Sequence, residues 1–373
     1  MDPLPQIRLK IERRSSHPWI FQKMVEKPAV KPKPGSIVDI VDRDGHWVGR
    51  GFYNGHSRIA LRVLTTDPDE AIDGAFFDRR IDRAIALRRE WLRLDRVTDA
   101  YRLVHAEGDG LSGLVVDRYG DVLVTEYFSA GMWKCRTAIR RALERHFPGA
   151  VHYGFAEEHV AKQESVDIPT SEPPRAVVIV EHGLRFKVAP GSKHKTGFFL
   201  DQRDNRRWLA EHCGGRRVLD LCCNSGGFAI YAKALGEASE VVGVDLDESV
   251  LELARDNARR NAAQVRFVQA DLFAWLRDVV VGNGERFDVV VLDPPKLTRE
   301  KEQVIPALKK YLDMNKLALQ ALHPGGLLLT CSCTGLIDEA SFLEMLRRAA
   351  FYAGRSVQVL RIAGAGPDHP WMV

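Results

Sequence analysis

The pattern of hydrophobic and polar positions divides the chain into three parts. In the first part, residues 36–41, 47–52 and 59–64 alternate as strands do, and Asp44-Gly45 predicts a type I′ hairpin turn between the first two. The polar, proline-containing residues 65–73 end this part. Short strands joined by glycine-rich turns indicate a small β-rich domain at residues 1–73.

The second part mixes helical and strand patterns. Residues 76–94 repeat apolar side chains, among them Phe77, Ile81, Ile85 and Trp91, at helical spacing opposite an arginine-rich face. The segments 114–116 and 122–125 predict a hairpin, 132–146 predicts a helix, and 151–155 and 176–180 predict strands. We therefore predict an α+β domain at residues 74–184.

From residue 185 onward, short apolar runs alternate with helical patterns, which predicts an α/β, Rossmann-like domain with a mostly parallel sheet at 185–373. An acidic residue lies at the carboxyl end of each of four consecutive predicted strands: Asp220, Asp245, Asp271 and Asp293. Ligands of open α/β sheets bind at these strand ends. Each acid taken alone is equally well explained as a helix cap or a solvated loop residue.

The turn Asn224-Ser225-Gly226-Gly227 follows the first of these strands. Its glycines would let a ligand approach the backbone, but it lacks the Gly-x-Gly-x-x-Gly pattern that holds a pyrophosphate. S-adenosylmethionine is a nucleoside cofactor without phosphate, and we predict it here. Asp245 is expected to accept from the ribose hydroxyls and Asp271 from the adenine amine.

The run from Asp293 through Pro294-Pro295 to Lys296 ends the fourth strand, where the substrate should meet the cofactor. Amino-group methyltransferases place an aromatic residue at the fourth position of a similar motif, so Lys296 disfavours transfer to an amine. The next strand, 325–330, carries Cys331 and Cys333 to the same edge. A thiolate that attacks carbon 6 of a pyrimidine makes carbon 5 nucleophilic, so a cysteine is useful there. We assign catalysis to Cys333, Cys331, Asp293 and Lys296; the alternative is that both cysteines are small buried hydrophobes.

Composition and charge narrow the class of protein. The chain has 373 residues, 45% of them hydrophobic and 28% charged, and a net charge of +4. Basic residues cluster at 8–14, 79–93 and 193–207, which is compatible with contacts to RNA phosphates. No apolar run approaches the length of about 18 residues that a membrane helix needs, and no secretory signal is recognisable. We expect a cytoplasmic protein without membrane contact. The six cysteines form no Cys-x-x-Cys pair, so we predict no metal site.

Several further motifs make the chain resemble a known family, the large-subunit ribosomal RNA 5-methylcytosine methyltransferases that carry an N-terminal PUA domain. They are Ser16–Phe21, Gly49–Asn54, Glu107–Leu114, Glu157-Glu158-His159, His194–Arg203, Asp293–Lys296 and Ser332–Gly335. The resemblance implies that the first domain binds RNA, that large-subunit ribosomal RNA is the substrate and that Cys333 is the nucleophile.

The resemblance also raises questions about individual residues. Cys331 is the rival nucleophile, because Thr330-Cys331-Ser332 matches a second class of RNA cytosine methyltransferases. That class has another cysteine where this chain has Pro295, so a two-cysteine mechanism is disfavoured. By resemblance, Lys195, Thr196, Gln202 and Arg203 lie around the methionine carboxylate or a substrate phosphate. Family members continue beyond residues 368–370 with a last strand, so we expect the sheet of this chain to lack that strand.

Two other functions remain open. One is a methyltransferase that acts on a base nitrogen and does not need either cysteine. The other is an RNA-binding protein that keeps S-adenosylmethionine without catalysis. The sequence leaves the oligomeric state open, a homodimer included.

Overall fold

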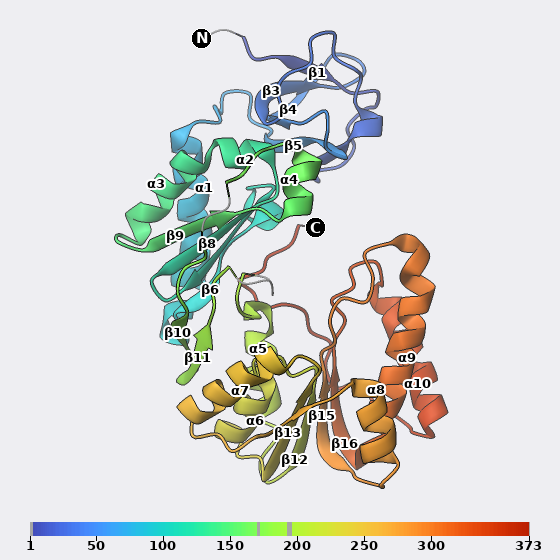
Figure 1. The fold of residues 1–373 in the computed structure, drawn as a ribbon. Coiled ribbons are helices and arrows are strands. Elements are labelled where there is room, and N and C mark those ends of the chain that lie inside the picture. The colour runs from blue at the N-terminus through green and yellow to red at the C-terminus, as the bar shows by residue number, and fades with distance from the viewer. Residues whose placement is uncertain (1–2, 170–171, 192–195, 373) are drawn as a thin grey trace. The chain divides into compact units, whose positions relative to one another are not determined.

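The structure, a computed structural model, describes residues 3–169, 172–191 and 196–372. The chain forms two compact units (Figure 1). The first unit comprises residues 1–183, 188–201 and 365–373, and the second comprises residues 184–187 and 202–364. The domain boundaries after residues 73 and 184 stay a prediction.

The N-terminal part of the first unit is a five-stranded sheet with the order β1-β3-β4-β5-β2. Its strands are β1 (Gln6–Arg8), β2 (Trp19–Phe21), β3 (Ser36–Val41), β4 (Trp47–Tyr53) and β5 (Ile59–Thr65). The three strands predicted here are confirmed, but the type I′ turn is wrong. That turn needs positive φ at both central residues, and only Gly45 of the pair has it, at 92°. Instead, Asp42 Oδ1 accepts from the backbone N–H groups of Asp44 and His46 and closes a longer loop.

The middle part of the first unit is a four-stranded sheet with the order β6-β7-β8-β9, packed against helices. The strands are β6 (Ala100–His105), β7 (Leu114–Tyr119), β8 (Val122–Tyr127) and β9 (Val151–Phe155), and the helices are α1 (Gly74–Ala86), α2 (Ala130–Lys134), α3 (Arg136–His146) and α4 (Glu158–Glu164). The predicted hairpin is confirmed as β7 and β8, and the predicted helix 132–146 is divided into α2 and α3 at Cys135. The strand predicted at 176–180 is β10 (Val177–Glu181), and β11 (Leu184–Val188) follows it in the sequence.

Helix α1 confirms the amphipathic prediction over most of its length. Asp73 caps it by accepting from the N–H of Phe76 at 2.9 Å, and Phe77, Ile81 and Ile85 are buried. At Leu87–Trp91 the helix widens into a π-helical turn, which breaks the 3.6-residue spacing. Trp91 is consequently 82% exposed, so its predicted place on the apolar face is wrong.

The motif Glu107–Leu114 connects the two sheets of the first unit. Glu107 Oε1 accepts from Trp19 Nε1 and from Ser112 Oγ, both at 2.7 Å. The same oxygen lies 3.5 Å from Arg62 Nη1, and the Arg62 guanidinium lies over the Trp19 ring. Burial lowers the pKa of Arg62, and the carboxylates of Glu164 and Glu107 oppose that shift. The Glu107 carboxylate therefore compensates the charge of the buried Arg62 guanidinium. This contact joins β5 to the 3₁₀ turn that contains Glu107.

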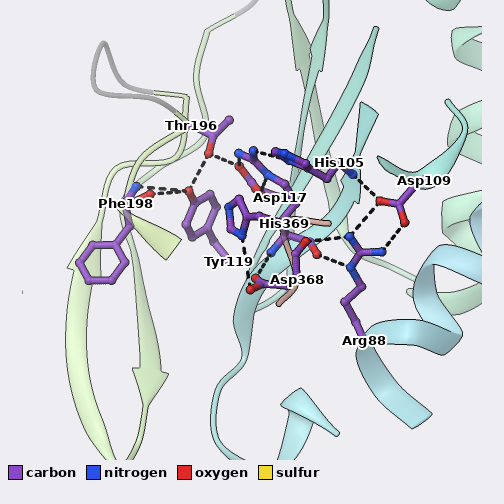
Figure 2. A network of polar contacts seen from close by, with 10 residues as sticks. Arg88, His105, Asp109, Asp117, Tyr119, Thr196, Phe198, Asp368 and His369 are labelled. Carbon is purple, nitrogen blue, oxygen red and sulfur yellow. Dashed lines mark hydrogen bonds and ion pairs between the residues drawn. The ribbon is translucent and has the colours of Figure 1, made fainter. Parts of the chain in front are cut away.

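A buried polar network holds the C-terminal segment and residues 196–198 on the β6–β7 pair (Figure 2). Arg88 forms a bidentate ion pair with Asp109 and donates to the backbone carbonyl of Asp368 at 2.7 Å. The Asp368 carboxylate accepts from the backbone N–H of Arg102, whose guanidinium in turn pairs with Asp117. Buried charges of this kind are stable only when they are fully paired, so the network fixes these segments in place.

Helix α5 and a five-stranded parallel sheet with helices on both faces form the second unit (Figure 1). The sheet order is β14-β13-β12-β15-β16. Its strands are β12 (Arg217–Leu221), β13 (Glu240–Asp245), β14 (Arg266–Gln269), β15 (Phe287–Leu292) and β16 (Leu322–Thr330). The helices are α5 (Arg203–Ala210), α6 (Gly227–Ala234), α7 (Glu248–Arg260), α8 (Leu272–Ala274), α9 (Val304–Gln320) and α10 (Glu339–Ala353). The short helical turns in the described parts of both units are η1 (Gln22–Met24), η2 (Leu87–Trp91), η3 (Leu94–Arg96), η4 (Ala106–Asp109), η5 (Leu200–Gln202), η6 (Trp275–Val281) and η7 (Lys301–Gln303).

The apolar runs of the central strands β12, β13 and β15 are continuous because both faces of the sheet are covered there. Leu219 packs with α9 and α10 on one face, and its neighbour Val218 packs with α5 and α6 on the other. The α/β, Rossmann-like architecture predicted from the sequence is thus confirmed. β14 and β16 are the edge strands among the described residues, and the expectation of a missing last strand stays a prediction. No helix in the described ranges combines the length and the apolar character needed to cross a membrane.

Candidate active site

The sheet of the second unit reverses its strand order at β12. β13 and β14 lie on one side of β12, and β15 and β16 lie on the other. The carboxyl ends of β12 and β15 therefore border a topological switch point, where ligands of open α/β sheets bind. Asp220 is the penultimate residue of β12, and Asp293 directly follows β15. The structure thus places two predicted acids at the expected edge.

The four predicted acids converge around one thiol. Burial raises the pKa of Cys222 to about 12, and the charges of Asp245, Asp293, Asp220 and Asp271 add to that rise. Such an acidic group favours a positively charged ligand. S-adenosylmethionine carries a sulfonium and an ammonium group, so the charge of the site fits this cofactor.

Asp220 is fully buried. Its Oδ2 accepts from the backbone N–H of Ala229 at 2.9 Å, whereas Oδ1 has no hydrogen-bond partner among the described residues. Burial raises its pKa to about 8, and the nearby Asp293 and Asp245 raise it further. An unpaired buried carboxylate oxygen is costly, and a cationic ligand group would remove that cost.

Asp245 ends β13 and holds the turn that follows β12. Its Oδ2 accepts from the backbone N–H of Asn224 at 2.9 Å, and its Oδ1 accepts from Asp247 at 3.1 Å. Asn224 has a φ of 47°, a conformation that asparagine tolerates better than most residues. The Asp245 carboxylate is therefore oriented before any ligand binds.

The two glycines of this turn are needed for packing and backbone conformation. Gly226 has a φ of 81°, and a Cβ there would lie 3.2 Å from both Ile230 and Phe267. A Cβ at Gly227 would lie 3.2 Å from the Arg206 side chain. A side chain at either position would meet the chain itself, and the close approach of a ligand to this turn stays a prediction.

Asp271 has a structural role in addition to any contact with a ligand. Its Oδ1 accepts from the N–H groups of Phe273 and Ala274, each at 3.0 Å, and so caps the short helix α8. This is the helix-cap role that the sequence left open. Leu246, which the sequence analysis missed, follows Asp245 and is 66% exposed at the same edge of the sheet. Its apolar surface lies beside the residues expected to hold a nucleoside.

Asp293 and Cys331 share one neighbour, Gln202. The side-chain nitrogen of Gln202 donates to Asp293 Oδ2 at 3.0 Å and lies 3.5 Å from Cys331 Sγ. Gln202 Oε1 accepts from Asn205 Nδ2 at 2.7 Å. The structure thus places Gln202 beside Asp293, whereas its contact with the methionine carboxylate or a substrate phosphate stays a prediction. Asn205, which the sequence did not single out, contacts Gln202.

A buried tyrosine on α9 anchors the loop that carries both cysteines. Tyr311 Oη accepts from Ser332 Oγ at 3.2 Å and lies 3.1 Å from Thr334 Oγ1. Thr334 Oγ1 also accepts from the backbone N–H of Leu297 at 3.3 Å, so the loop after β15 is fixed as well. Cys333 is exposed, and its Sγ lies 3.7 Å from the carbonyl oxygen of Pro294. The alternative that both cysteines are buried hydrophobes is therefore wrong for Cys333, whereas Cys331 is partly buried.

The remaining predicted site residues lie in different surroundings. Lys296 is exposed, and Arg203 is fully buried with its Nε 3.2 Å from Asp204. Thr196 belongs to the first unit, where it is buried and bonded to Asp117 and Tyr119 (Figure 2). Lys195 lies outside the described residues. The structure thus does not bring Thr196 together with the acids of β12, β13 and β15 within one unit.

Comparison with known families decides the class of this site. The model of the S-adenosylmethionine-dependent methyltransferases matches residues 101–368, more than half of the chain. The chain belongs to the S-adenosylmethionine-dependent methyltransferase family. A second model, that of a PUA-like domain, matches residues 11–66. This methyltransferase therefore uses S-adenosylmethionine as its cofactor, and its N-terminal sheet is PUA-like.

The relatives of the methyltransferase are similar over nearly its whole length. It is 42% identical to "Ribosomal RNA large subunit methyltransferase I" of Aeromonas hydrophila, over 95% of this chain and 91% of the relative. It is 43% identical to the protein of that name from Tolumonas auensis, over the same shares of the two chains. The fold matches the crystal structure of SMU.776, a methyltransferase complexed with SAH, with a TM-score of 0.81 and 20% identity over 99% of this chain and 95% of that chain.

Proposed function

We propose that this methyltransferase forms 5-methylcytosine in large-subunit ribosomal RNA and that Cys333 is the nucleophile. The names of the relatives support the RNA substrate, and the PUA-like sheet supports RNA binding. The observation that carries the choice of carbon 5 is the exposed Cys333 thiol in the loop anchored beside Asp293-Pro294. A ribosomal RNA substrate also agrees with the predicted cytoplasmic location.

The cofactor supplies an electrophilic methyl group when it is bound. The residues of this chain would prepare the acceptor. The Cys333 thiolate adds to carbon 6 of the cytosine, and the electrons of the C5–C6 double bond then make carbon 5 nucleophilic. After carbon 5 has accepted the methyl group, a base removes its proton, the electrons of the C5–H bond form the double bond again and the thiolate leaves. The base must be unpaired or flipped out to reach these groups.

Asp293 would bind the base, because its carboxylate accepts hydrogen bonds and the exocyclic amine of cytosine donates them. Lys296 is exposed next to this motif and remains a proposed catalytic residue. Cys331 is the weaker candidate nucleophile, because it is partly buried and its sulfur already faces Gln202. Pro295 takes the place of the second cysteine of the rival class, so a mechanism that needs two cysteines is disfavoured.

The cofactor would be held mainly by the acids of β12, β13 and β15. Asp220 would receive a cationic group at its unpaired oxygen, and Asp245 the ribose hydroxyls. Asn224, Gly226 and Gly227 shape the turn between them, while Asp271 would contact the adenine. We retain Gln202, Arg203, Thr196 and Lys195 as proposed contacts to the methionine carboxylate or a substrate phosphate.

The test is product identification with unmodified large-subunit ribosomal RNA and labelled S-adenosylmethionine. After digestion to nucleosides, mass spectrometry should find labelled 5-methylcytidine with the wild type and with Cys331→Ala, and none with Cys333→Ala. RNA that contains 5-fluorocytidine should form a covalent complex only when Cys333 is present, because fluorine cannot leave carbon 5 as a proton does. A methyl group on a base nitrogen would contradict the proposal, as would the absence of any transfer.

A further inference from the structure

Two side-chain amides connect the C-terminal segment of the second unit to the proposed active site. Gln202 directly precedes α5, and Asn205 lies in the first turn of that helix. Because residues three apart share one side of a helix, the two side chains meet. Asn205 Nδ2 donates to Gln202 Oε1 at 2.7 Å and to the backbone carbonyl of Gly364 at 3.2 Å.

The contacts at the two ends fix which way both amides point. A backbone carbonyl can only accept, so the NH₂ group of Asn205 must face Gly364 and, with its second hydrogen, Gln202 Oε1. The NH₂ group of Gln202 must then point the other way, toward Asp293 Oδ2 at 3.0 Å and Cys331 Sγ at 3.5 Å. The carboxylate of Asp293 can also only accept, so both ends of the chain of contacts require the same orientation.

We propose that Asn205 is a positioning residue that holds the Gln202 amide with its NH₂ group toward Asp293 and Cys331. Held in this way, Gln202 donates to one carboxylate oxygen of Asp293 and helps to orient that carboxylate toward the substrate base. A flipped Gln202 would instead place its carbonyl oxygen against the carboxylate and the sulfur, and the repulsion would turn Asp293 away from the base. The effect on turnover rests on the proposed function, whereas the orientation of the amide does not.

The aspartate variant separates this role from simple packing. Asn205→Asp keeps the size of the side chain but cannot donate, so two acceptors face each other at Gly364 and Gln202. The repulsion between the new carboxylate and Gln202 Oε1 is relieved only when the Gln202 amide flips. We expect Asn205→Asp to lower kcat/KM on RNA by about 10-fold to 100-fold, which is the range of a hydrogen bond to a charged group. Asn205→Ala no longer holds the Gln202 amide in one orientation, but it does not force the amide to flip. It should therefore lower kcat/KM less than Asn205→Asp does, mainly through kcat. If Asn205 served packing alone, alanine would be the more damaging change, and that order of effects would overturn the proposal.

A second readout does not depend on turnover. The NH₂ group of Gln202 stabilises a thiolate at Cys331, so a flipped amide should slow alkylation of Cys331 by iodoacetamide by about threefold or more. Exposed Cys333 is the internal control and should react at an unchanged rate in each variant, as measured by peptide mass spectrometry. Gln202→Glu imitates the flipped amide and should slow Cys331 as Asn205→Asp does, and the double variant should be no slower than either.

The two readouts distinguish the possible failures. Unchanged Cys331 alkylation in Asn205→Asp, in a protein whose melting temperature is that of the wild type, would overturn the proposed orientation. Slower alkylation in a protein whose wild type transfers no methyl group to RNA would support the orientation and contradict the proposed function.

Discussion

Asp220 accepts a hydrogen bond from the backbone N–H of Ala229 at 2.9 Å with one oxygen and buries the other without a partner in the described chain. The first contact links the end of β12 to the first turn of α6 and fixes the carboxylate. The second oxygen is buried without a hydrogen bond, which disfavours the charged form, and burial raises the pKa of the Asp220 carboxyl group to about 8. A carboxyl group that is held in one orientation and lowers the stability of the ligand-free protein is typical of a binding site.

The first prediction concerns Asp220→Asn. The pKa of Asp220 is higher in the folded protein than in the unfolded chain. As pH rises above the pKa of the unfolded chain, the free energy of unfolding therefore falls, and it continues to fall until about pH 8. The amide keeps an acceptor for Ala229 and carries no charge. We expect the ligand-free variant to be more stable than the wild type at pH 8, by at least about 1 kcal/mol, and equally stable at pH 4.

The same variant should lose affinity for the cofactor. Calorimetric titration with S-adenosylhomocysteine should show at least about 10-fold weaker binding, since an ammonium partner loses a charged hydrogen bond. Asp288→Asn is the matched control, because Asp288 accepts from the backbone N–H of Arg217 on the same sheet. Unchanged affinity in Asp220→Asn would argue against the assigned role.

The second prediction concerns the contact between Glu107 and Arg62. Glu107→Ala removes a partner of the buried Arg62 cation and leaves the Trp19 N–H without its acceptor. Breaking a buried ion pair costs about 3–5 kcal/mol, and we expect a loss of that order in denaturant unfolding. Glu107→Gln keeps Oε1 as the acceptor for Trp19 and Ser112 and should cost clearly less. Equal losses in the two variants would mean that the charge of Glu107 is unimportant.

The third prediction concerns the Tyr311 hydroxyl, which holds Ser332 and Thr334. Tyr311→Phe should cost about 1–2 kcal/mol of stability, because the buried Thr334 hydroxyl and the exposed Ser332 hydroxyl each lose a partner. It should also reduce kcat about 10-fold, with cofactor affinity unchanged, because the loop that carries Cys333 loses its anchor.

Phe342→Leu is the control for this prediction. The Phe342 ring packs edge-on against Tyr311 with ring centroids 5.6 Å apart, so its truncation lowers stability without removing the hydroxyl. If both variants lowered kcat equally, general destabilisation would explain the result.

The sequence predicted the second unit well because its central strands β12, β13 and β15 are buried on both faces. Such strands are continuous apolar runs, and the polar residue that ends each run lies at the ligand-binding edge by topology alone. For this reason Asp220, Asp245 and Asp293 were placed correctly. The helix-capping role of Asp271 could not be separated from ligand binding, because the pattern of a cap and that of an acid at a strand end are the same.

Other contacts could not be predicted because the residues that form them are remote in sequence. Thr196 lies six residues before Gln202, yet its partners Asp117 and Tyr119 belong to the first unit. Tyr311 occupies an ordinary apolar position of α9, and only its hydroxyl contacts reveal a link to the cysteine loop. Trp91 was misplaced because no sequence rule signals the π-helical turn at Leu87–Trp91.

The fourth prediction concerns His105, which lies within the network of Figure 2. Its Nδ1 lies 3.0 Å from Arg102 Nη1, and its ring packs against that of His369 at 5.2 Å. Burial lowers its pKa to about 4; the charges of Arg102 and His369 act in the same direction, while Asp109 and Asp117 oppose them. The folded protein thus keeps this histidine neutral where the unfolded chain protonates it.

The sign of the pH effect follows from this difference. Above about pH 6.5, the ordinary pKa of histidine, His105 makes its full contribution to the free energy of unfolding. That contribution is lost as pH falls toward about 4, because the unfolded chain takes up the proton more readily than the folded protein. His105→Asn keeps an acceptor for Arg102 but has no proton to gain. Its free energy of unfolding should therefore fall less than that of the wild type between pH 7 and pH 4, by roughly 3 kcal/mol at most. Urea unfolding at both pH values measures the difference, with His17→Asn on the exposed N-terminal loop as control. Parallel pH dependence in wild type and His105→Asn would show that His105 is protonated as readily in the folded protein as in the unfolded chain.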